Sequence, residues 1–149
     1  KKLVGICFGH QLVAHVLGGK TAKSSKGWGV GRHETTLSDP CRPQWSREFG
    51  LLSSHQDQVQ SLPDQARVIA QSDFCPIAGM AIGDHIVTLQ GHPEFTKAYA
   101  RDLLGVRREL LGETLYQQGV DSLDEEVHQD RVALIITDFL AEAAADTAA

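Results

Sequence analysis

The sequence predicts an α/β fold with a central, mainly parallel sheet. A short apolar run, Leu3–Ile6, passes through a glycine-rich turn into apolar residues at helical spacing, as in a strand followed by a helix. Several runs of strand type follow in the middle of the chain. After residue 94 the apolar spacing becomes helical again. This succession of strands and helices is typical of layered α/β domains.

The first helix is expected within residues 11–17, where Leu12, Val13, Val16 and Leu17 recur at the spacing of one helical face. Two glycines, 18 and 19, follow it directly. Glycine adopts the positive φ of a left-handed helix end without steric cost, so the helix is predicted to end there.

The middle of the chain is predicted to be mostly strand. Residues 20–50 are rich in Gly, Ser, Pro and Arg, and we expect a surface excursion with one strand at 29–37, anchored by Trp28 and Trp45. Further strands are predicted at 49–53, 66–71, 77–82 and 85–90. Gly83-Asp84 between the last two is a two-residue hairpin signal.

Two closing helices are predicted after residue 94, joined by a connector at 119–124 with Asp121 or Ser122 as a cap. Residues 141–149 are expected to fray. A single domain over residues 1–149 is predicted from the chain length. Only one strand-helix crossover is visible, and Lys1 is not preceded by Met. We therefore expect the N-terminal part of the domain to be missing, because a sheet covered on both faces needs several crossovers.

Composition excludes several classes of function. A formal charge of −5 and no long basic run make nucleic acid an unexpected ligand. No apolar run approaches the roughly 20 residues of a membrane span. Three cysteines without a C-x-x-C pair indicate neither a disulfide framework nor a zinc site, and a cytoplasmic location is expected. No metal or organic cofactor is predicted, and the following histidines are assigned to the surface or to a helix face: His10, His15, His33, His85 and His128.

The residues from Gly5 to Gln11 carry the first chemical motif, Gly-Ile-Cys-Phe-Gly-His-Gln. Its G-x-C-x-G pattern is typical of a nucleophile elbow, a sharp turn from strand to helix that exposes the central side chain. The helix start favours a thiolate and is expected to bring the pKa of Cys7 to roughly 3.5–7.5. The backbone N–H of Phe8 is predicted to form half of an oxyanion hole. The alternative is that Cys7 is a small buried hydrophobic residue.

The second motif is Gln-Gly-His-Pro-Glu, at residues 90–94 after an apolar strand. A thiol nucleophile needs an imidazole base, and the imidazole needs a carboxylate to fix its tautomer. His92 and Glu94 fit these roles if Pro93 bends the chain back. The alternative is a helix start with Pro93 in its first turn.

Taken together and in this order, the two motifs resemble those of class I glutamine amidotransferases, over about residues 3–99. The resemblance implies a flavodoxin-like fold in which Cys7 is the nucleophile, His92 the acid and base, and Glu94 the orienting carboxylate. It also implies that Gln11 contacts the bound glutamine. The segment Ser-Ser-His-Gln-Asp at 53–57 is similar to a loop that holds the α-amino and α-carboxylate groups, which makes Ser54 and His55 candidate binding residues; an ordinary polar turn is the alternative.

The activity implied by the resemblance is hydrolysis of the γ-amide of glutamine through a thioester on Cys7. The ammonia would pass to a separate synthase subunit, because the chain has no nucleotide-binding motif. Two alternatives stay open. One is a stand-alone γ-glutamyl peptidase that uses the same residues, and the other is a non-catalytic α/β module that binds a partner through an open sheet edge. Trp28 is a candidate for the rim of the pocket, although packing of its loop is the preferred interpretation.

Overall fold

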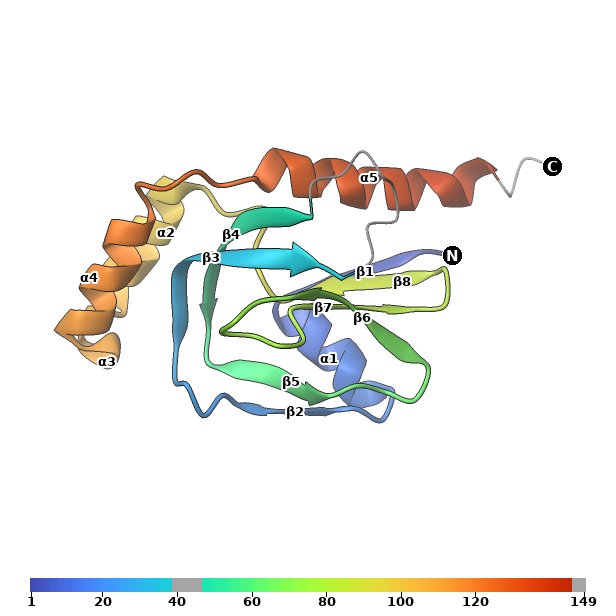
Figure 1. Cartoon of the computed structure of the whole chain (residues 1–149), viewed down its shortest axis with the longest axis horizontal. Coiled ribbons are helices and arrows are strands. Elements are labelled where there is room, and N and C mark those ends of the chain that lie inside the picture. The colour runs from blue at the N-terminus through green and yellow to red at the C-terminus, as the bar shows by residue number, and fades with distance from the viewer. Residues whose placement is uncertain (39–46, 146–149) are drawn as a thin grey trace.

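The computed structural model describes residues 1–38 and 47–145, with side chains described up to residue 142. Trp45, named above, and Cys41, one of the three cysteines, lie outside these residues. A six-stranded sheet forms the centre (Figure 1), and its strands in spatial order are β1 (Leu3–Ile6), β8 (Ile86–Leu89), β7 (Gly79–Ile82), β6 (Ala66–Gln71), β3 (Gly29–Leu37) and β4 (Glu48–His55). A two-stranded sheet pairs β2 (Lys20–Lys23) with β5 (Asp57–Ser61).

The α/β fold is confirmed, but the strand pairing differs from the expected mainly parallel sheet. Within the described ranges only β1 and β8 pair in parallel, and the other pairs of the sheet are antiparallel. Short connections explain this difference, because a tight turn can join only antiparallel neighbours whereas parallel strands need a long crossover. The turn between β7 and β8 is one example: Ile82 pairs with Ile86, which leaves a three-residue loop instead of two, with Gly83 at φ 54°.

Helices cover both faces of the sheet (Figure 1). Helix α1 (Phe8–Val16) and strand β5 pack on one face, through a cluster of Ala14, Val59 and Met80. Helix α5 (Gln129–Ala145) lies across the opposite face, where Val132 joins a cluster around Phe49. The large side chains of these clusters are almost fully buried, so the sheet has a core on each side.

Among the described residues after 94 there are four helices, instead of the two predicted. They are α2 (Lys97–Val106), α3 (Arg108–Leu111), α4 (Glu113–Ser122) and α5. The predicted connector at 119–124 is wrong because α4 continues to Ser122. Gly119 lets α4 pack closely against α2, since a Cβ on Gly119 would lie 2.9 Å from Leu104 Cδ2. The fraying tail predicted at 141–149 is wrong for residues 141–145, which belong to α5, and residues 146–149 lie outside the described residues.

Two strands were not predicted, β2 and β5. They pair antiparallel with each other from Lys20↔Ser61 to Lys23↔Asp57. The predicted end of the first helix is confirmed, with Gly18 at φ 98° just after Leu17. None of the helices in the part of the chain that is described combines the length and the apolar character that crossing a membrane demands.

Candidate active site

Cys7 sits in a strained turn between β1 and α1, as the first motif predicts. Its φ of 50° is the only positive φ of a non-glycine residue in the described ranges. L-residues adopt such a conformation only when their surroundings hold it, and strain of this kind clusters at functional sites. Gly5 allows the turn to close, because a Cβ there would lie 2.9 Å from the backbone of Gly9.

The parallel pair of β1 and β8 brings the two motifs together. Ile6 pairs with Leu89, and the Cys7 N–H donates to the Leu89 carbonyl over 2.8 Å. The next residue, Gln90, donates from its side-chain amide to Cys7 Sγ over 3.5 Å. Because the carboxyl ends of parallel strands meet at one edge, the residues after β1 and after β8 are neighbours.

His92 and Glu94 form the predicted imidazole-carboxylate pair, with His92 Nδ1 lying 2.6 Å from Glu94 Oε1. Pro93 and Glu94 lie in a turn and α2 begins only at Lys97, so the alternative of a helix start at Pro93 is wrong. Two further contacts fix His92: its backbone N–H donates to Leu52 O over 2.8 Å, and its ring stacks on Phe95 with 3.8 Å between the ring centroids.

A cavity of about 360 Å³ opens beside the thiol. Its lining includes three of the predicted binding residues, Gln11, Ser54 and His55, so these residues lie around the same cavity as Cys7. The full lining is Cys7, Gln11, Trp28, Ser54, His55, Gln56, Asp57 and Arg107. The Gln11 side-chain amide donates to Asp57 O over 2.7 Å and to Gln90 Oε1 over 3.2 Å, so it is fixed against the 53–57 segment and against the second motif. Phe8 is 71% exposed, and its backbone N–H bonds to the Cys7 thiol.

Arg107, which sequence reasoning missed, borders this cavity from the junction of α2 and α3. It donates from Nη1 to Ser54 Oγ over 2.5 Å and lies 5.1 Å from the centre of the Trp28 ring. Trp28 lines the cavity and also packs against the hydrophobic cluster under α2, so both interpretations of Trp28 apply.

Burial raises the pKa of the Cys7 thiol above its ordinary value, contrary to the expected thiolate. The Phe8 N–H and the Gln90 amide act in the opposite direction, and the Glu94 charge adds to the increase. Desolvation outweighs the helix start because it penalises the charged form of the whole side chain. The raised pKa favours the thiol form of Cys7, so a nucleophilic role would require a proton acceptor.

Two histidines near the site are buried and neutral. Burial lowers the pKa of His55 to about 4, and its Nδ1 lies 3.1 Å from Asp57 O. His10 was assigned to the surface or a helix face, but its side chain is fully buried between Thr88 Oγ1 at 2.7 Å and Ile77 O at 3.1 Å. Burial also lowers the pKa of His10 to about 4. The buried His10 side chain therefore stabilises the turn at Cys7 and does not face solvent.

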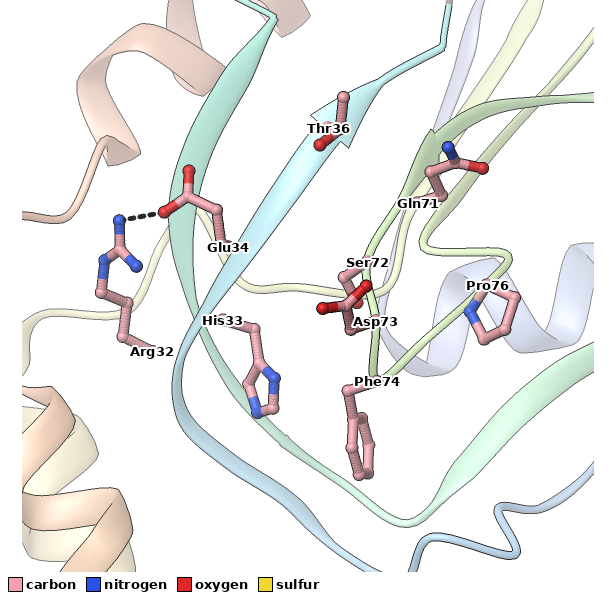
Figure 2. Close-up of a pocket in the computed structure, with 9 residues that line it drawn as sticks. All are labelled: Arg32, His33, Glu34, Thr36, Gln71, Ser72, Asp73, Phe74 and Pro76. Carbon is pink, nitrogen blue, oxygen red and sulfur yellow. Dashed lines mark hydrogen bonds and ion pairs between the residues drawn. The ribbon is translucent and has the colours of Figure 1, made fainter.

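A larger cavity of about 540 Å³ lies elsewhere, between β3 and the segment after β6 (Figure 2). Strands β3 and β6 share only the residue pairs Thr36↔Gln71 and Leu37↔Ala70, and the two strands diverge beyond these pairs. None of the predicted site residues lines it, and its Arg32 is paired with Glu34. Within the described ranges no group of three His, Cys, Asp or Glu side chains is placed to hold a metal ion.

The fold is that of the flavodoxin-like α/β class, and the family follows from comparison. Residues 1–104 match the family described as glutamine amidotransferase class-I. The chain belongs to this family.

Several relatives are similar along most of the chain. It is 30% identical to γ-glutamyl peptidase 2 of Arabidopsis thaliana over 94% of this chain and 60% of that protein. It is 31% identical to the glutamine-hydrolysing GMP synthase of Thermomicrobium roseum over 91% of this chain and 27% of that protein. The crystal structure of a glutamine amidotransferase from Thermotoga maritima superposes with a TM-score of 0.66 at 20% identity, covering 80% of this chain and 53% of the other. The chain spans 41–60% of the length of the first three γ-glutamyl peptidases that it matches.

Proposed function

We propose that this chain hydrolyses a γ-glutamyl amide through a thioester on Cys7. The observation that carries the proposal is the strained position of Cys7 at a helix start, with the Phe8 N–H directed at its sulfur and the His92–Glu94 pair after the neighbouring strand. Nucleophile, acyl-oxygen donor and oriented imidazole are the three parts that acyl transfer by a thiol requires.

The proposed steps use these residues in turn. Cys7 Sγ attacks the γ-carbonyl carbon while its proton moves to His92, whose Nδ1 is engaged by Glu94 and whose Nε2 accepts. The C–N bond then breaks, and His92 returns the proton to the leaving amine. Water next attacks the thioester with His92 as base, and glutamate and the free thiol are released. The negative oxygen of each tetrahedral intermediate is stabilised by the Phe8 N–H.

Covalent labelling tests the nucleophile. A glutamine analogue with a diazoketone in place of the amide should add to Cys7, as mass spectrometry of a digest would show. Cys75 is the internal control, since it is buried and burial raises its pKa to about 12. Equal labelling of both cysteines, or labelling of Cys41 instead, would disprove the assignment. Cys7→Ser should abolish both labelling and turnover.

The leaving amine defines two versions of the activity. Similarity to γ-glutamyl peptidase 2 over 94% of the chain favours a peptide amide. Similarity to a glutamine-hydrolysing GMP synthase subunit of Pyrococcus abyssi, 33% identical over 74% of the chain, favours glutamine and a synthase partner that receives ammonia. Glutamate release from L-glutamine and from γ-glutamyl dipeptides, measured side by side, separates them. No release from either substrate, with no label on Cys7, would instead favour the non-catalytic module.

A further inference from the structure

The cavity beside Cys7 contains an unneutralised guanidinium. Of the described residues that line it, Arg107 carries the only positive charge and Asp57 the only negative one, His55 being held neutral by burial. Arg107 is half-buried, and no carboxylate in the described ranges pairs with it. A partly desolvated guanidinium without a counter-ion favours an anionic ligand.

Two neighbours hold this guanidinium in place. Nη1 donates to Ser54 Oγ over 2.5 Å and to Ser54 O over 3.4 Å, while the Trp28 ring lies against the guanidinium at 5.1 Å. The donors on Nε and Nη2 have no acceptor among the described residues. A planar fork that is fixed on one side and open on the other is suited to bidentate binding of a carboxylate.

The position of the cavity identifies which carboxylate this is. In the proposed reaction the leaving amine faces His92, and His92 is not among the described residues that line the cavity. The acyl part of the substrate therefore occupies the cavity. In a γ-glutamyl group the α-carboxylate lies about 5 Å from the γ-carbonyl carbon, at roughly 1.5 Å per C–C bond. This reach matches a cavity whose lining includes both Cys7 and Arg107.

We propose that Arg107 determines specificity for the γ-glutamyl group by binding its α-carboxylate, with Ser54 and Trp28 as the residues that position the guanidinium. The inference rests on the proposed function for the orientation of the substrate. It holds for glutamine and for γ-glutamyl peptides alike, because the two share the α-carboxylate.

The test compares L-glutamine with 4-aminobutanamide, which is glutamine without its α-carboxylate. In Arg107→Met, kcat/KM for L-glutamine should fall about 100-fold, the size expected for one charge-assisted contact, and Arg107→Lys should recover part of the loss. Turnover of 4-aminobutanamide should fall far less, because this substrate loses only the effect of the Arg107 charge, which lowers the Cys7 pKa. Arg108→Met is the matched control, because Arg108 pairs with Glu113 on the surface and should leave both substrates unaffected. An equal loss on both substrates in Arg107→Met would overturn the proposal, since it would indicate a structural role.

A binding measurement separates this inference from the hydrolase activity. Calorimetry on the Cys7→Ala chain should detect L-glutamine but not 4-aminobutanamide, and adding Arg107→Met should weaken L-glutamine binding about 100-fold. If the wild-type chain hydrolyses neither amide and this Arg107-dependent binding persists, the proposed function fails and the inference stands. Binding that is insensitive to Arg107→Met, or no binding of L-glutamine, would overturn the inference.

Discussion

Two glycines flank the Cys7 turn, and alanine substitution should affect stability with opposite signs at the two positions. A Cβ on Gly5 would lie 2.9 Å from both C and O of Gly9 and 3.0 Å from Thr88 Cγ2. The first two contacts are backbone atoms, so they cannot be relieved by a side-chain rotation. Gly5→Ala must therefore push the first turn of α1 away from β1, and overpacking of this kind costs roughly 1–3 kcal/mol.

Gly9→Ala is the matched substitution. A Cβ on Gly9 meets nothing within 4 Å, and the residue lies inside α1. Alanine is favoured over glycine in a helix by roughly 0.5–1 kcal/mol, so this variant should be more stable than the wild type by up to that amount. The two single-methyl variants are thus expected to differ by about 1.5–4 kcal/mol.

Urea unfolding followed by circular dichroism measures this difference as a shift in midpoint at constant slope. Gly5→Ala should also slow alkylation and turnover at Cys7, because the turn that exposes the sulfur is the part that moves. A Gly5→Ala chain as stable as the wild type would refute the steric argument. An equal loss in Gly9→Ala would show that both positions need glycine for another reason.

Further predictions concern titration and the His92–Glu94 pair. Because burial raises the pKa of the Cys7 thiol, iodoacetamide labelling of Cys7 should keep accelerating above about pH 8.5, and a plateau below neutral pH would contradict the thiol assignment. Glu94→Gln removes a charge that raises this pKa, so at pH 8 labelling should accelerate while turnover falls by less than in His92→Ala, which should abolish it. His10 and His55 are neutral in the fold with pKa values of about 4, so both contributions to stability are present above about pH 6.5 and are lost as the pH falls toward 4. His10→Asn should reduce this pH dependence of urea unfolding by about one proton, and an unchanged dependence would show that His10 does not contribute.

The sequence predicted the placement of the candidate catalytic residues because their geometry is local. The elbow at Cys7 needs small residues two positions away on each side, and the His92–Glu94 pair needs only a bend at the intervening proline. Each of these two requirements therefore depends only on a few consecutive residues. Parallel pairing of β1 with β8 then brings the two motifs to one sheet edge.

Arg107 could not be found in this way. Its contact with Ser54 spans 53 positions in the sequence, and it comes from a helix junction that the apolar spacing did not reveal. Strand β2 was not predicted for a related reason. Lys20–Lys23 has polar and charged residues, and it forms a strand only because β5 pairs with it. Burial of His10 likewise depends on Thr88, 78 positions away. Long-range packing decided these features, and local propensity did not.

The two sides of the thiol differ in how much they constrain a substrate. On the acyl side the cavity has fixed polar partners, with Arg107 held by Ser54 and with Gln11 held by Asp57 and Gln90. On the side of the imidazole the Glu94 side chain is 56% exposed and Tyr99, beyond Phe95, is 51% exposed. Under the proposed mechanism this open side faces the leaving amine. If both proposals hold, selectivity for the γ-glutamyl group and acceptance of different leaving amines would have separate structural origins.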